Sequence, residues 1–226
     1  MRRQSSERGR DPFLDLARAI RRLTGRHATQ EEQQRFERYL ALLLVWNRVH
    51  RMTGLGSPAE IVRGIFQHSL LFLRVLPPGP LVMADIGAGA GIPGVPLRIV
   101  RPEISLTLIE SKRKPVSFLA SLKRELNLPE MEVLEGRAED LAREFPSLVG
   151  RFDVVVSRAA GSLPQLIPTA MQYLRNGGVF ITSGPPAGKP RPVLPVGRFG
   201  AKWEMVSGGE AELDRSFLLI SNRQVP

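Results

Sequence analysis

The sequence predicts an α/β fold with a doubly wound, mostly parallel seven-stranded sheet and an N-terminal helical extension. Two observations predict it. From Leu81 onward, short apolar runs alternate with amphipathic helical stretches, which is typical of parallel strands joined by crossover helices. Before Leu81, apolar residues recur at the spacing of amphipathic helices. We therefore expect a disordered basic tail at residues 1–12, a helical cap at 13–80 and an α/β core at 81–226.

Three helices are expected in the extension. Apolar side chains have helical spacing between Pro12 and Leu23. Thr29 is followed by two glutamates, a pattern typical of a helix start, so a second helix begins there. A third helical stretch is expected from Pro58 to Leu76.

Seven short apolar runs predict the strands of the core. They are residues 81–86, 105–109, 132–134, 152–157, 178–182, 203–206 and 216–220. Helical stretches separate the first five runs, but not the last two, so the last two are expected to pair as an antiparallel hairpin. Residues 183–200 are rich in proline and glycine and predict a loop.

The charge balance favours a polyanionic partner. The chain has 32 lysines and arginines against 22 acidic residues, a net charge of +10, and residues 1–26 are especially rich in arginine. Cationic side chains bind nucleic acid by releasing counterions from its phosphates. The alternative is that an arginine-rich composition reflects only the base composition of the genome.

Several classes of site are not expected. The chain has no cysteine, which excludes disulfides, thiolate metal sites and a cysteine nucleophile. Its three histidines lack metal-ligand spacing, so we expect no metal. No apolar run approaches the roughly 20 residues of a membrane span, and the N-terminus lacks the apolar core of a signal peptide. We expect a cytoplasmic protein that acts as a monomer and not at a membrane.

A glycine-rich turn follows the first predicted strand. Asp85, Gly87, Gly89 and Gly91 form the pattern D-x-G-x-G-x-G, the usual signature of class I S-adenosylmethionine-dependent methyltransferases. Glycines let the backbone turn sharply and approach a ligand. A carboxylate at Asp85 suits the ammonium and sulfonium of S-adenosylmethionine and would repel a pyrophosphate. A nicotinamide-dependent oxidoreductase is the alternative, but Gly91 lies one residue short of the G-x-G-x-x-G spacing.

Four further candidate residues follow predicted strands, at the edge where such sheets bind ligands. Glu110 ends the second strand, where an acid normally holds ribose hydroxyls; the alternative is a solvated strand-end acid. After the third strand, backbone groups of Ala138 and Glu139 are candidates for reading adenine. Arg158 follows the fourth strand and is the candidate catalytic residue.

Four strings carry a resemblance to a known family. They are Trp46–Thr53, Ile92–Leu97, Arg101–Glu103 and Ser157–Ala159. Together with the glycine turn they resemble the glucose-inhibited division protein B family, over about residues 35–222. Members of that family methylate guanine N7 in bacterial small-subunit ribosomal RNA.

The resemblance implies a cofactor, a partner and a set of site residues. The implied cofactor is S-adenosyl-L-methionine, and the implied partner is ribosomal RNA or the small ribosomal subunit. Gly87, Ile92, Ala138, Glu139 and Arg158 occupy the family's cofactor-contact positions.

The chain also departs from the family pattern. His68 stands where the family usually has an aspartate, and Ser183 stands where the fifth strand usually ends in a lysine. Both differences concern RNA contact or catalysis more than cofactor binding. They leave open a non-catalytic relative that binds the cofactor, beside a methyltransferase of a small molecule or protein.

Arg158 has more than one possible role. Guanine N7 carries a lone pair and no proton, so its methylation needs orientation rather than a general base. A guanidinium at the sheet edge is suited to contact the base, an RNA phosphate or the cofactor carboxylate. The alternative is an ordinary surface ion pair.

Overall fold

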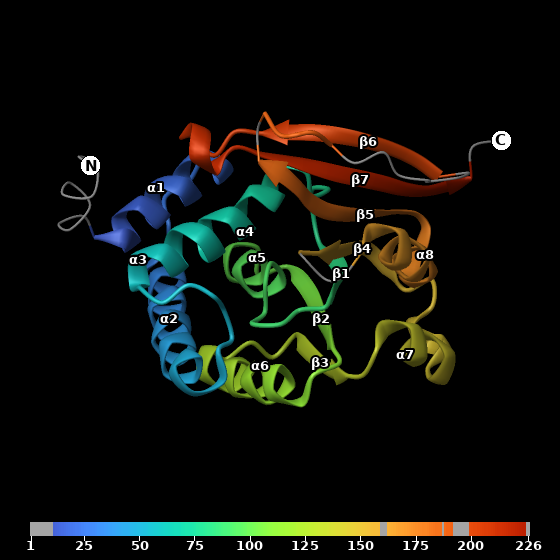
Figure 1. Cartoon of the computed structure of the whole chain (residues 1–226), viewed down its shortest axis with the longest axis horizontal. Helices are drawn as coiled ribbons and strands as arrows, with labels where there is room; N and C mark the ends of the chain where they lie inside the picture. The colour runs from blue at the N-terminus through green and yellow to red at the C-terminus, as the bar shows by residue number, and fades with distance from the viewer. Residues whose placement is uncertain (1–10, 159–161, 187, 192–198, 225–226) are drawn as a thin grey trace.

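A seven-stranded sheet forms the centre of the structure (Figure 1), a computed structural model that describes residues 11–158, 162–186, 188–191 and 199–224. The strands are β1 Leu81–Ile86, β2 Ile104–Glu110, β3 Met131–Glu135, β4 Phe152–Ser157, β5 Leu174–Pro186, β6 Phe199–Val206 and β7 Arg215–Gln224. Their order across the sheet is β3-β2-β1-β4-β5-β7-β6. Among the described strands, β7 runs opposite to the rest, so it pairs antiparallel with both of its neighbours, β5 and β6. The predicted fold class and the predicted hairpin of the last two strands are confirmed.

The strand order fixes where a ligand can bind. From β1 the chain moves outward to β2 and β3, then returns to place β4 on the other side of β1. Loops that leave β1 and β4 therefore diverge to opposite faces and open a crevice at the carboxyl ends of these strands. Both the glycine turn and Arg158 follow strands at this edge.

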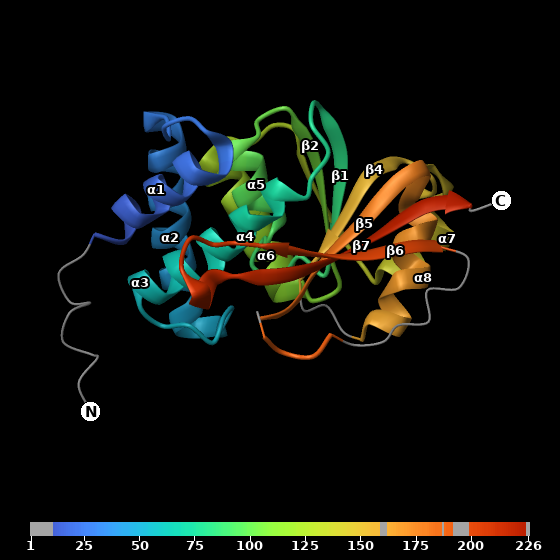
Figure 2. The same cartoon turned by 90° about the horizontal axis from the view of Figure 1, so that it is seen from above.

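Helices cover both faces of the sheet. The helices between the first five strands are α5 Gly94–Val100, α6 Arg113–Leu126, α7 Ala138–Glu144 and α8 Leu163–Tyr173. Seen from above, α7 and α8 lie on one face, and α5 and α6 lie on the other together with the N-terminal helices (Figure 2). Two apolar clusters result, one on each side of the sheet.

The N-terminal extension is helical, as expected. Its segments are α1 Pro12–Thr24, α2 Gln30–His50, α3 Pro58–Ile61, a π-helical turn Val62–Gln67, α4 His68–Leu70 and a 3-10 turn Leu71–Arg74. Thr29 caps α2 as predicted: its hydroxyl accepts from the Glu32 amide, and the Glu32 carboxylate accepts from the Thr29 amide. The third predicted stretch is thus a run of four short segments rather than one regular helix.

The extension and the sheet share one apolar core. α1 buries Leu16 and Ile20, and α2 buries Phe36 and Tyr39, in the same cluster as Leu106 of β2. The helices of the extension are therefore packed onto the sheet as part of the same folded unit.

The last two residues of the predicted tail, 11 and 12, belong to the start of α1. Residues 1–10 lie outside the described residues, but Pro12 begins α1, and the Asp11 carboxylate caps it by accepting from the Phe13 amide at 2.9 Å. Asp11 and Pro12 are favoured residues for a helix start.

The loop predicted at 183–200 is partly wrong. β5 continues to Pro186 and pairs with β7 through Ser183 and, after an irregularity, through Pro186. β6 begins at Phe199, and residues 187 and 192–198 lie outside the described residues. β7 lies between β5 and β6 and pairs with both, so it gives these proline- and glycine-rich segments backbone partners that local composition does not reveal. Within the described ranges, no helix is long and apolar enough to cross a membrane.

Candidate cofactor and substrate site

An open cleft of about 1450 Å³ lies at the carboxyl edge of the sheet. Its floor is the glycine turn after β1, the end of β2 and the loop after β3. The N-terminal extension forms a second wall, through residues 50–55 and the π-helical turn. The predicted cofactor residues Gly87, Gly89 and Ile92 all line this cleft.

The glycine turn needs its glycines. Gly87, Gly89 and Gly91 have φ angles of 73°, 54° and 85°, in the left-handed region that side chains rarely adopt. A Cβ atom at Gly91 would also lie 2.8 Å from the Val95 side chain. Gly91 itself does not line the cleft. Its φ angle and its close neighbours show that it shapes the turn, and its predicted contact with the cofactor stays a prediction.

Glu110 braces this turn. Its carboxylate is almost buried, at 7% exposure, and lines the cleft. One oxygen accepts from the Gly89 amide at 2.9 Å and the other from the Lys112 amide at 2.8 Å. The alternative of a solvated strand-end acid is therefore wrong. A carboxylate oxygen accepts more than one hydrogen bond, so lone pairs remain for the predicted ribose hydroxyls.

Replacing Glu110 by alanine is expected to raise the Kd for S-adenosylmethionine by about 10- to 100-fold, the effect of losing hydrogen bonds to a charged group. Isothermal titration calorimetry measures this. Glu135→Ala is the matched control, because Glu135 is the register partner of Glu110 on β3 and is exposed. Equal affinities for Glu110→Ala and wild type would exclude Glu110 from the site.

Asp85 lies behind the turn rather than in the cleft. It is fully buried and does not line the cleft. Its Oδ2 accepts from the Gly94 amide at 2.8 Å, while nothing among the described residues hydrogen-bonds to Oδ1. Burial raises the pKa of Asp85 to about 7, against the lowering effect of the Gly94 hydrogen bond and with a further raising effect from Glu110. The structure thus assigns Asp85 to holding the start of α5, and its predicted contact with the cofactor stays a prediction.

Asp85→Asn is expected to change how stability depends on pH. Because the pKa of Asp85 is raised from 3.8 to about 7 on folding, the stability this carboxyl contributes is fully present below its unfolded pKa and is lost as the pH rises to about 7. Asparagine does not titrate, so the free energy of unfolding of wild type relative to the variant should fall by a few kcal/mol over this window. Denaturant unfolding at a series of pH values measures it. A difference independent of pH would mean that Asp85 does not titrate there.

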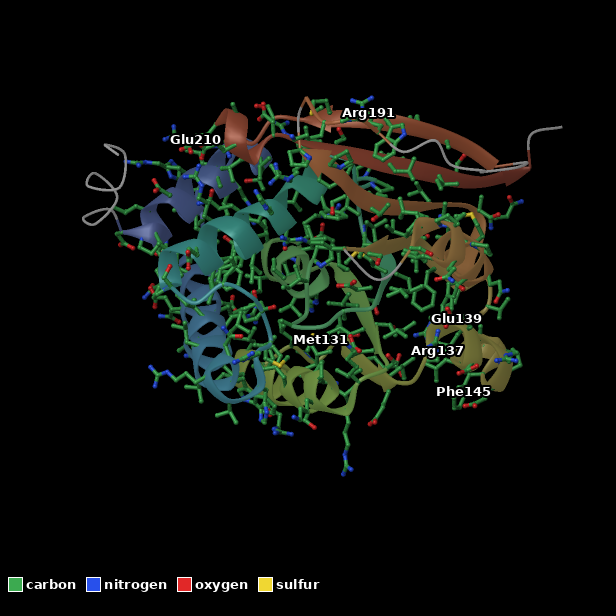
Figure 3. All side chains as sticks on the ribbon, viewed as in Figure 1. Met131, Arg137, Glu139, Phe145, Arg191 and Glu210 are labelled. Atoms are coloured by element: carbon green, nitrogen blue, oxygen red, sulfur yellow. The ribbon has the colours of Figure 1, made fainter. Side chains whose placement is uncertain are left out.

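The loop after β3 contributes Ala138 and Glu139. Both line the cleft, and the Gly136 amide donates to the Glu110 carbonyl at 2.9 Å, which places this loop beside the end of β2. Figure 3 shows Glu139 beside Arg137 at the start of α7, and their side chains approach to 3.7 Å. The two predicted adenine contacts are therefore brought to the same cleft as the glycine turn.

Arg158 is anchored to the N-terminal extension. Its guanidinium donates to the Gly64 carbonyl at 2.7 Å and to the Ile65 carbonyl at 3.5 Å, and it lines the cleft. Its hydrogen bonds among the described residues go to main-chain carbonyls and not to an acid, which does not favour the surface ion-pair alternative. Burial and the nearby Arg215 lower the pKa of Arg158 from its ordinary value.

Two further residues line the cleft. The sequence did not predict Arg215 there, and it predicted no role for His68. Arg215, at the start of β7, lines the cleft beside Arg158 only because β7 pairs with β5, and no local pattern in the sequence signals this. His68 also lines the cleft, and burial together with Arg215, Arg158 and Arg63 lowers the pKa of His68 to about 4. His68 is therefore neutral at pH 7. Groups of three or more potential metal ligands are absent from the described residues.

Comparison with known families decides the class of protein. A family model for rRNA small subunit methyltransferase G (GidB) matches residues 32–183. The chain belongs to this family. Ribosomal RNA small subunit methyltransferase G of Desulfitobacterium hafniense is 36% identical over 74% of this chain and 69% of the relative. The protein of that name from Syntrophus aciditrophicus is 40% identical over 65% of this chain and 61% of the relative, less than two thirds of its length.

Solved structures support the fold alone. A SAM-dependent methyltransferase from Aquifex aeolicus superposes with a TM-score of 0.54 at 13% identity, covering 76% of this chain and 96% of that chain. As a member of the methyltransferase G family, the chain has the predicted enzyme class, methyltransferase, and the predicted cofactor, S-adenosylmethionine.

Proposed function

We propose that this chain transfers a methyl group from S-adenosylmethionine to N7 of a guanine in small-subunit ribosomal RNA. One observation carries the proposal. The family match, residues 32–183, runs through nearly all the segments that line the cleft, from residues 50–55 of the extension to Ser183 of β5. The family model therefore covers most of the cleft and not only the sheet.

The cleft has features that fit the cofactor. The glycine turn brings main chain to the cleft surface, and a braced carboxylate at Glu110 lies next to it. Gly87, Ile92, Glu110, Ala138 and Glu139 would hold the cofactor. When bound, S-adenosylmethionine supplies an electrophilic methyl group on a sulfonium. The volume of the cleft exceeds that of a typical small-molecule pocket, leaving room for a nucleotide beside it.

The chain's part in the reaction is to orient the base and exclude water. Guanine N7 has a lone pair and no proton to remove, so no general base is required. Arg158, fixed by two carbonyls of the extension, is suited to hold O6, the acceptor beside N7 in guanine. A fixed donor at this edge keeps N7 in line for transfer.

The rim of the cleft suits an RNA backbone. Arg51 of the extension, the run Lys112–Lys114 after β2, and Arg137 after β3 all line the cleft. Cations around the entrance neutralise phosphates and position a strand without reading its sequence. An unpaired or extruded guanine can then enter.

Methyl transfer from tritiated S-adenosylmethionine tests the proposal. The acceptors are naked 16S RNA, assembled small subunits and a protein fraction, and borohydride–aniline scission identifies N7-methylguanine. Label in RNA with scission at one guanine is expected. Label in protein or a small molecule supports that alternative instead, and cofactor binding without transfer to any acceptor supports a non-catalytic relative.

We propose a cytoplasmic enzyme, because its substrate would be ribosomal RNA. We also propose a monomer, since residues of one chain line the whole described cleft. Sedimentation of the purified protein with and without small subunits tests the second point.

A further inference from the structure

The chain contains two tyrosines, Tyr39 and Tyr173, and both are fully buried. A buried phenol needs a hydrogen-bond partner, and its choice of partner is therefore informative. Tyr39 lies on α2 and Tyr173 at the end of α8, in the apolar clusters on opposite faces of the sheet. Each hydroxyl donates a hydrogen bond to a main-chain carbonyl in a loop that lines the cleft.

Tyr39 holds the glycine turn. Its hydroxyl donates to the carbonyl of Ala90, which lines the cleft. The ring is fixed by Phe66 and Phe118, with ring centroids at 4.9 and 6.4 Å. A Cβ atom at residue 91 would lie 3.1 Å from the hydroxyl, so Gly91 leaves room for this contact. Burial raises the pKa of Tyr39 well above its ordinary value, which keeps the donor protonated.

Tyr173 holds the loop after β3 in the same way. Its hydroxyl donates to the carbonyl of Ala138 at 2.7 Å, and Ala138 lines the cleft at the start of α7. The ring packs against Phe152 of β4, with ring centroids 5.9 Å apart. Burial raises the pKa of Tyr173 to about 12.

We propose that Tyr39 and Tyr173 are positioning residues that hold the two cofactor loops in their binding conformation, one from each face of the sheet. Neither side chain lines the cleft, so each acts through the carbonyl that it holds. A loop held before binding loses less conformational freedom when the ligand binds, and affinity rises accordingly. The inference rests on the proposed function only in taking S-adenosylmethionine as the ligand.

Tyr39→Phe and Tyr173→Phe keep the rings and remove the hydroxyls. Each is expected to raise the Kd for S-adenosylmethionine about fivefold, the effect of one neutral hydrogen bond. The double variant should lose about 25-fold, because the two tethers share no contacts. In methyl-transfer assays the KM for the cofactor should rise, while kcat and the KM for RNA stay near wild type.

A second readout needs no cofactor. Hydrogen exchange of the Gly91 and Ile92 amides, which donate to the Ala88 carbonyl, should become faster in Tyr39→Phe. Exchange of the Asp140 and Leu141 amides at the start of α7 should become faster in Tyr173→Phe. Each variant should leave the other loop unchanged.

Ile104→Val is the matched control. Ile104 is buried at the amino end of β2, far along the strand from the cleft, and its truncation causes a comparable small loss of stability. If the tyrosine variants bind the cofactor as tightly as Ile104→Val, the tyrosines are packing residues only and the inference is overturned. If wild type itself does not bind S-adenosylmethionine, the proposed function fails instead, and the exchange readout still tests the tethers.

Discussion

Replacing Gly87 by valine is expected to abolish measurable binding of S-adenosylmethionine. Gly87 has a φ of 73°, which a β-branched residue adopts only with strain, and it lines the cleft directly after β1. Its amide donates to the Ile109 carbonyl at 2.9 Å, so a shift at Gly87 also disturbs the end of β2 next to Glu110. Isothermal titration of the purified variant measures the loss.

The control for this variant is Gly150→Val. Gly150 has a similar φ of 66°, with nothing within 4 Å of an added Cβ, but it precedes β4 at the opposite edge of the sheet. Both variants should lose stability. The titrations are therefore carried out at a temperature at which circular dichroism shows that both variants are folded. Gly150→Val should bind the cofactor as wild type does. Binding by Gly87→Val at wild-type strength would contradict the cofactor site.

The parts of this fold that the sequence predicts are those with local causes. β1 and β4 begin and end where predicted, because each is a mostly apolar run bounded by turn residues and largely buried in a parallel part of the sheet. The glycine turn is predictable for the same reason, since positive φ angles at Gly87, Gly89 and Gly91 select glycine locally. Their places after the second and third predicted strands put Glu110 and Ala138 at one edge of the sheet, and in the structure both line the cleft.

The parts that were missed depend on contacts between distant segments. Asp85 has the expected place in the turn, but only the packing around it shows that the carboxylate is buried and holds the Gly94 amide. Arg215 reaches the cleft through the pairing of β7 with β5, and β5 extends to Pro186 through the same pairing. The hydrophobic pattern predicts that the last two strands pair with each other, but it does not show that β7 also pairs with β5.

The anchoring of Arg158 is also a long-range feature, and it sharpens the question of what this residue does. The residue follows β4, yet its hydrogen bonds go to carbonyls 93 and 94 positions earlier in the chain. The extension therefore fixes the orientation of a cation on the sheet edge. Arg158 therefore connects the sheet edge to the N-terminal extension by hydrogen bonds, and these bonds restrict its side chain.

Arg158→Lys is expected to lower turnover on ribosomal RNA by about 10- to 100-fold, with little change in cofactor affinity. Lysine keeps the charge but not the planar fork that reaches Gly64 and Ile65 while presenting further donors. A reacting base that is misplaced by about 1 Å loses up to about 100-fold in rate. Single-turnover methyl transfer gives the rate, and isothermal titration gives the Kd for S-adenosylmethionine.

Arg175→Lys is the matched control for this substitution. Arg175 pairs with Asp153 on the opposite edge of the sheet and is 58% exposed, so its replacement should leave the rate unchanged. If the rate and the cofactor affinity of Arg158→Lys fall together, Arg158 holds the cofactor rather than the base. If Arg158→Lys transfers methyl groups at the wild-type rate, Arg158 serves only to anchor residues 62–67 to the sheet, and the assignment of a catalytic residue after β4 is wrong.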